Sequence, residues 1–166
     1  EILAHHFLEA GVAEIAAAYL LASGDAAASR YASPEAHARF ARAAELARQL
    51  APAPRAQRTE LKAILKCASV AFGAAQIEAD LAALERAREL AVALDHRPRL
   101  AQVHYWRGRL HYVAGRFAEA VGEGQACLAI ADEVADERIA AAAVNLLARI
   151  HCLRGEPAHG IAYAQR

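Results

Sequence analysis

The stretch "GRLHYVAGRFAEAV", from Gly108 to Val121, decides the fold. It holds two glycines seven residues apart, Gly108 and Gly115, with Tyr112 between them and Ala120 five residues after the second. Small residues mark places where two helices can cross closely, and a glycine can close a helix in a left-handed turn. The stretch therefore predicts a helix hairpin that turns at Gly115.

The same spacing recurs along the chain. The copies are carried by Ala148, Gly155 and Gly160, by Ala4, Phe7, Gly11 and Ala16, and by Gly24, Ala36, Phe40 and Ala43. A copy near Cys67 fits at Ala68, Leu84 and Ala87 but has Asp80 where a small residue is expected. One hairpin cannot bury its own apolar stripe, so a series of hairpins predicts a stacked α-solenoid.

Composition supports an all-α fold in one domain. The 166 residues are 57% hydrophobic but only 6% aromatic, and no segment alternates with the period of a strand. We expect helices over roughly 2–10, 12–23, 25–32, 34–50, 56–73, 77–94, 99–114, 117–134, 137–154 and from 157 onward. Paired into hairpins, these give 2–23, 24–50, 56–94, 99–134 and 137–166, all within a single repeat domain over 1–166. The chain begins and ends within helical patterns, so we expect it to be an excised piece of a longer protein.

Charge and cysteine content narrow the function classes. Nineteen basic and nineteen acidic residues give a formal net charge of zero, which argues against nucleic-acid and membrane-surface binding. Three well-separated cysteines predict no disulfide framework and favour a reducing, cytoplasmic location. No apolar run is long enough to span a bilayer. We find no phosphate-binding loop, dinucleotide loop or zinc-protease motif, and we expect no catalytic residue, cofactor or metal.

The repeated pattern resembles the tetratricopeptide repeat. The residues that carry the resemblance are Gly108, Tyr112, Gly115 and Ala120, then Ala148, Gly155 and Gly160, with Ala4, Phe7, Gly11 and Ala16 at the start. The chain departs from the family pattern at Arg107, Gly124 and Asp132, where a leucine, an aromatic residue and a proline are usual. Its repeat spacing of 40 residues, from Gly115 to Gly155, also exceeds the usual ~34. The resemblance implies a right-handed solenoid in which the first helix of each hairpin lines a concave groove.

A second resemblance covers Leu3 to Pro52. The segment "LAHHFLEAG…AAAYLLASGDAAASRYASPEAHARFARAAELA" is similar to the start of the helical-repeat region that follows the ATPase module in large bacterial signalling proteins. These include multidomain class III adenylate and guanylate cyclases and related ATPase-containing transcriptional regulators. The resemblance implies a regulatory or sensor segment, with any cyclase or ATPase activity outside this chain.

The tetratricopeptide resemblance also implies which side chains face the groove. Transferred position by position, they are Lys62, Lys66, Gln102, Tyr105, Arg109, Tyr112, Asn145 and Arg149. Arginine and asparagine can bond a carboxylate and a peptide backbone, and tyrosine packs with little loss of entropy. The set therefore predicts a groove for an acidic peptide or a C-terminal carboxylate. Trp106 is expected in the core or between repeats.

The sequence leaves two other functional hypotheses open. The groove positions can be ordinary solvated residues or can be covered by another part of the parent protein, which would make the chain a structural spacer. In that reading an exposed terminal helix would favour a homodimer. The third reading is an enzyme or small-molecule sensor, for which only His104, His111 and Cys152 offer candidate metal ligands.

Overall fold

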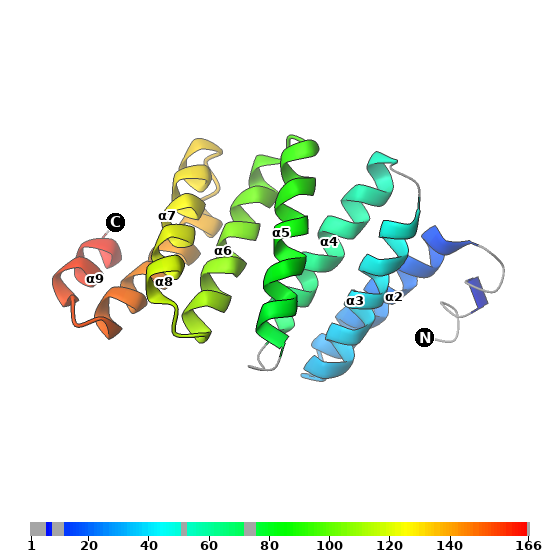
Figure 1. The fold of residues 1–166 in the computed structure, drawn as a ribbon, viewed down its shortest axis with the longest axis horizontal. Coiled ribbons are helices and arrows are strands. Elements are labelled where there is room, and N and C mark those ends of the chain that lie inside the picture. The colour runs from blue at the N-terminus through cyan, green and yellow to red at the C-terminus, as the bar shows by residue number, and fades with distance from the viewer. Residues whose placement is uncertain (1–5, 8–11, 51–52, 72–75, 166) are drawn as a thin grey trace. The chain divides into compact units, whose positions relative to one another are not determined.

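The computed structural model of the chain describes residues 6–7, 12–50, 53–71 and 76–165 (Figure 1). These residues form eight α-helices and contain no strand, which confirms the all-α prediction. The helices are α2 (Ala13–Ala28), α3 (Ser33–Gln49), α4 (Pro54–Val70), α5 (Ile77–Ala93), α6 (Arg97–Val113), α7 (Phe117–Glu133), α8 (Glu137–Leu153) and α9 (Pro157–Ala164). Most of the expected helix 2–10, including Ala4, lies outside the described residues, as does Gly11.

A regular 20-residue module explains the 40-residue repeat. Helices α5 to α8 each have 17 residues, and three-residue turns separate α5 to α9 from one another. Proline occupies the first turn of α3, α4, α6 and α9, where its missing N–H costs no helical hydrogen bond. Two helices and two turns therefore make a unit of 40 residues.

The turns between these helices share one backbone geometry. Asp95, Gly115, Ala135 and Gly155 have φ of 48°, 73°, 54° and 75°, all in the left-handed region. At Gly115 the N–H bonds to Tyr112 O, and the next N–H, of Arg116, bonds to His111 O. Corresponding pairs of bonds close α7 and α8. This is the Schellman arrangement, which satisfies carbonyl groups at a helix end. The predicted role of Gly115 and Gly155 is confirmed.

Exchanging residues at this turn position has opposite expected effects on stability. Gly115→Ala should destabilise the fold by about 1 kcal/mol, because an alanine at positive φ is strained. Ala135→Gly should stabilise it by roughly 0.5 kcal/mol, because it relieves that strain at some cost in chain entropy. No atom lies within 4 Å of the Cβ that Gly115 would gain, so the expected loss of stability comes from the backbone and not from a steric clash. Urea unfolding followed by circular dichroism measures both changes, and equal signs would contradict the turn assignment.

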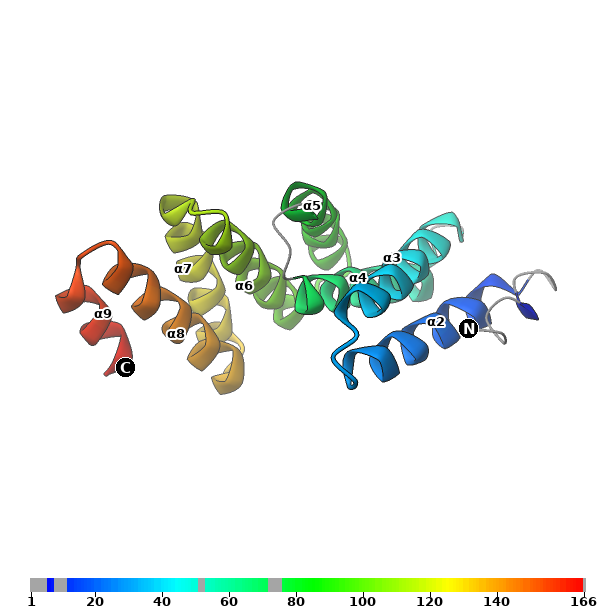
Figure 2. The same cartoon turned by 90° about the horizontal axis from the view of Figure 1, so that it is seen from below.

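The chain divides into two compact units, Glu1–Leu90 and Ala91–Arg166. In unit 1, α3 packs against α2 and α4, and α2 also reaches α4 (Figure 2). Its core gathers Ala16, Ala17, Leu20, Leu21, Ala27, Ala36, Phe40, Ala43, Leu46, Ala63 and Cys67. The small residues predicted at helix crossings, Ala16, Ala36 and Ala43, have no exposed surface.

The break predicted at Gly24 is wrong. Helix α2 continues through this residue, so the expected helices 12–23 and 25–32 are one helix and the hairpin boundary at 23/24 does not exist. Gly24 is buried, and a Cβ added there would lie 2.4 Å from Phe40 Cε1. The glycine is therefore a close-packing position against α3 rather than a helix end. The first described hairpin pairs α2 with α3.

In unit 2, α7 packs against both α6 and α8, and α8 packs against α9 (Figures 1 and 2). Helices α6 and α8 are also in contact, which places the first helices of two successive hairpins side by side. Ala120 and Ile150 have no exposed surface, and Gly124 leaves room for Leu147, whose Cδ2 would lie 2.8 Å from an added Cβ. The described helices include none that is long and apolar enough to cross a membrane.

Candidate functional site

Six of the eight predicted groove residues lie in unit 2. Gln102, Tyr105, Arg109 and Tyr112 lie on α6, and Asn145 and Arg149 lie on α8. Their spacing on α6 gives one face of that helix. The two sets meet at Tyr112 and Arg149, which are in contact. We call the surface formed by these six residues the α6/α8 face.

The Tyr112–Arg149 pair is the best-defined contact of the α6/α8 face. The Arg149 guanidinium donates to the Tyr112 hydroxyl at 3.2 Å and lies 5.2 Å from the centroid of its ring. Tyr112 is half-buried against Ala120, Leu146 and Ile150, whereas Arg149 is exposed. Packing thus fixes the tyrosine, and the tyrosine in turn orients an arginine that solvent can reach.

Other side chains of the α6/α8 face contact neighbouring residues of α6. Arg109 lies 5.4 Å from the Trp106 ring, and Trp106 meets Tyr105 edge-on with 5.0 Å between ring centroids. Trp106 is half-buried, between the expected core position and a surface one. Gln102 accepts a hydrogen bond from Arg99 at 2.7 Å. These side chains are held in place by their neighbours rather than extended into solvent.

An open pocket adjoins the Tyr112–Arg149 pair. Its volume is about 490 Å³, and its lining consists of Tyr112, Ala148, Arg149, Cys152, Leu153, Gly160, Ile161 and Ala164. Leu153 and Ile161 are 61% and 56% exposed, a large fraction for aliphatic side chains. Asn145 lines a different pocket, between α7, α8 and α9, so the structure does not add its amide to this one. The result is an apolar hollow with one cation and one tyrosine at its edge. We call it the α8/α9 pocket.

The two predicted lysines lie in unit 1 on α4. Lys62 is exposed. Lys66 is half-buried, forms an ion pair with Asp25 of α2 and lies 5.4 Å from the centroid of the Phe40 ring. Its charge is therefore used within unit 1, where it ties α4 to α2.

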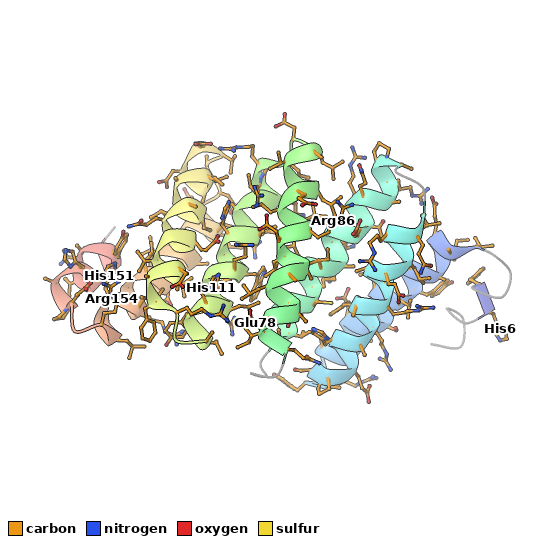
Figure 3. The ribbon with its side chains drawn as sticks, viewed as in Figure 1. His6, Glu78, Arg86, His111, His151 and Arg154 are labelled. Atoms are coloured by element: carbon orange, nitrogen blue, oxygen red, sulfur yellow. The ribbon has the colours of Figure 1, made fainter. Side chains whose placement is uncertain are left out.

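A buried polar cluster in unit 1 was missed by the sequence prediction. Asp80 is 6% exposed and its Oδ1 lies 2.9 Å from His37 Nε2, while its Oδ2 has no hydrogen-bond partner among the described residues. Glu60, 3% exposed, accepts a hydrogen bond at 3.3 Å from Arg86 of α5, which is labelled in Figure 3. These contacts join α3, α4 and α5 around a cavity of about 420 Å³. The one signal in the sequence was Asp80 itself, which breaks the small-residue rule of the repeat.

The histidines considered as metal ligands are not assembled. His104 Nδ1 lies 2.7 Å from Glu123, which also accepts from Arg107 at 2.7 Å. Burial raises the pKa of Glu123, but the bonds from His104 and Arg107 outweigh it and leave that pKa below its usual value. Burial, and then the charge of Arg116, lower the pKa of His111. Within the described chain, His104, His111 and Cys152 do not converge at metal-ligand spacing.

The three cysteines differ in their expected reactivity. Burial, and then the nearby charge of Asp80, raise the pKa of Cys67 to about 12, and burial raises that of Cys127 to about 12. Cys152 is exposed. At pH 8 a thiol with a pKa near 12 is about 10⁻⁴ thiolate, which is the reacting form. We expect Ellman's reagent to modify one thiol rapidly in the native protein and all three in denaturant. Cys152→Ser should remove the rapid phase, and a second rapid thiol would contradict the burial described here.

No protein-family model matches this chain, and no curated protein matches it.

Proposed function

We propose that the chain is a protein-interaction module of the tetratricopeptide type, which binds an extended segment of a partner protein on the α6/α8 face. The Tyr112–Arg149 pair carries this proposal. The pair places an oriented, exposed guanidinium next to the apolar α8/α9 pocket. Its two residues lie on α6 and α8, which are the first helices of their hairpins and are in contact. The shared length of α5 to α8 and the shared turn geometry from α5 to α9 support a right-handed solenoid as the larger arrangement.

The chemistry of the face indicates the kind of segment that would bind. Arg149 can donate two parallel hydrogen bonds to a carboxylate, from an acidic side chain or from a chain end. Leu153 and Ile161 would lose exposed apolar surface to an aliphatic side chain placed in the α8/α9 pocket. The proposed ligand is therefore a peptide with a carboxylate next to an aliphatic residue. We propose that the chain has this binding activity as a cytoplasmic regulatory segment of a larger bacterial signalling protein.

Removing the arginine charge should weaken such binding. Peptides selected from a displayed library against the wild-type chain serve as probes, and fluorescence anisotropy at low and high salt measures Kd. We expect Arg149→Gln to raise Kd about tenfold at low salt and to flatten its salt dependence, because one charge-assisted contact is lost. Tyr112→Phe should have a smaller effect, since it keeps the ring and removes only the hydroxyl that accepts from Arg149.

A matched control separates this contact from general charge attraction. Arg58→Gln makes the same charge change at an exposed residue of α4, in the other unit. We expect its Kd to stay within about twofold of wild type, because Arg58 is not among the residues of the α6/α8 face. Equal losses in the two variants would show nonspecific attraction. No loss in Arg149→Gln would show that the peptide binds elsewhere.

A second candidate function is self-association or packing within a parent polypeptide. The observation that favours it is the pair of exposed aliphatic side chains, Leu153 and Ile161, in one pocket. Sedimentation of the wild-type chain and of Ile161→Ser over a range of concentrations tests it. A concentration-dependent dimer that Ile161→Ser abolishes would replace the peptide proposal with this one. A monomer at all concentrations would leave the face open for a partner.

A further inference from the structure

The turn between α8 and α9 brings together two imidazoles and a carboxylate. His151 lies in the last turn of α8, Glu156 directly precedes α9, and His159 lies in the first turn of α9. Each of the three residues offers one ligand atom, and these three atoms all lie within 4.8 Å of one another. Figure 3 shows His151 and Arg154 at this end of the chain. We infer that these three side chains form a binding site for a divalent transition metal ion, with Zn²⁺ as the ion of best fit.

The donor separations lie on either side of the value expected for a metal centre. Two ligands of a tetrahedral zinc ion, each about 2.0–2.1 Å from it, lie roughly 3.3 Å apart. The Glu156 Oε2 atom lies 2.7 Å from His151 Nδ1 and 4.0 Å from His159 Nδ1, so the two separations bracket this value. Metal binding would replace the hydrogen bond between His151 and Glu156 and would bring His159 closer to Glu156. Two nitrogen ligands and one oxygen suit zinc and its neighbours in the first transition row, whereas calcium and magnesium prefer oxygen alone.

The backbone already holds the three donors in place. The N–H of Glu156 bonds to His151 O at 2.9 Å, and the N–H of His159 bonds to Glu156 O at 3.1 Å. Gly155, at φ 75°, supplies the left-handed step that returns the chain toward His151. Each ligand residue is thus tied by a backbone hydrogen bond to the next, which lowers the entropy lost on binding.

Neighbouring side chains orient the ligands in the way that outer partners do in known metal sites. Tyr163 stacks on His151 with 5.5 Å between centroids and an angle of 18°, and its hydroxyl accepts from Gln125 of α7 at 3.4 Å. Arg154 lies 3.1 Å from Glu156 Oε1, which leaves Oε2 turned toward the imidazoles. The side chain of His151 is 12% exposed and that of His159 is 71% exposed, so one ligand is anchored and the other lies on the solvent side.

The preceding repeat provides an internal comparison. Its turn has the same hydrogen bond, from Arg116 N to His111 O at 2.9 Å, and the same positive φ at Gly115. His111 occupies the place of His151 there, but Arg116 and Glu119 stand where Glu156 and His159 stand forty residues later. An arginine cannot ligate a metal. The complete donor set is therefore a feature of the last turn and does not follow from the repeat itself.

Titration of the full chain with ZnCl₂ tests the site. Calorimetry should give one ion per chain, and a saturating concentration should raise Tm by roughly 5 °C, because the ion binds the folded state and bridges α8 to α9. Co²⁺ should give the visible absorption of a four-coordinate nitrogen and oxygen site. Water would complete the coordination, since three protein ligands leave one position open.

Variants distinguish this site from adventitious binding. His159→Ala removes an exposed ligand without opening the core, and we expect at least a tenfold loss of Zn²⁺ affinity with an unchanged Tm in the absence of metal. His96→Ala removes a histidine that directly precedes α6, as Glu156 directly precedes α9, and this variant should bind like wild type. Absence of Zn²⁺ binding, or binding that His159→Ala leaves intact, would overturn the site. The test is independent of peptide binding on the α6/α8 face.

Discussion

Phe40→Ala should lower the free energy of unfolding by about 3–5 kcal/mol, the largest effect that we expect from one substitution. Phe40 is 1% exposed and lies in the core of unit 1 between α2 and α4. Truncation removes its apolar contacts and leaves a cavity beside Gly24, where the helices are already close. Urea unfolding followed by circular dichroism measures the loss, and a change below about 1 kcal/mol would contradict this packing.

Substitution of Gly24 in two backgrounds tests the contact between Gly24 and Phe40. In the wild type, Gly24→Ala should destabilise the fold, since its new Cβ would lie 2.4 Å from the Phe40 ring. In the Phe40→Ala background the ring is gone, and the same change should stabilise by up to about 1 kcal/mol through helix propensity and partial filling of the cavity. Gly122→Ala, on an open surface of α7, should stabilise in both backgrounds. Additive effects at Gly24 and Phe40 would show that the two residues do not touch.

The second large effect concerns the Glu60–Arg86 pair. Arg86→Met leaves the buried Glu60 carboxylate without its main partner. We expect a loss of roughly 2–3 kcal/mol, below the roughly 3–5 kcal/mol of a fully buried pair because the arginine is 43% exposed. The hydrogen bonds to Glu60 and then to Glu89 also raise the pKa of Arg86 above its ordinary value.

Removing both charges should cost much less than removing one. The double variant Glu60→Leu with Arg86→Met replaces a desolvated pair by apolar side chains and should lie within about 1 kcal/mol of wild type. Thermal or urea unfolding of the two single variants and the double variant gives the coupling energy. A double variant as unstable as Arg86→Met alone would show that Glu60 is not the source of the penalty.

Local signals in the sequence account for most of the fold. Gly115 and Gly155 predict their turns because a left-handed helix end needs a residue that accepts positive φ. The same rule gave a wrong helix end at Gly24, because a glycine inside a helix can also allow close packing of a neighbouring helix. The position of Phe40 shows that Gly24 has this packing role. Ala135 adopts the same turn without a glycine, so that turn has no glycine signal in the sequence.

The candidate sites were less predictable because their residues meet across different helices. Tyr112 and Arg149 were both assigned to the groove by the tetratricopeptide resemblance, but their hydrogen bond is visible only in the structure. His37 and Asp80 lie 43 residues apart on helices whose packing no periodicity specifies. His151 and His159 lie on either side of a reversal of the chain, where the spacing rules of a single helix do not apply.

A chemical-shift map of a selected peptide on the isotope-labelled chain tests the central claim most directly. The binding proposal predicts that backbone amide shifts change around Tyr112, Ala148 and Arg149, with a second group at Leu153 and Ile161 in the α8/α9 pocket. The Arg149→Gln variant should show the same changes only at about tenfold higher peptide concentration. Changes confined to Glu1–Leu90, or none at a concentration that saturates binding by anisotropy, would contradict a peptide site on the α6/α8 face.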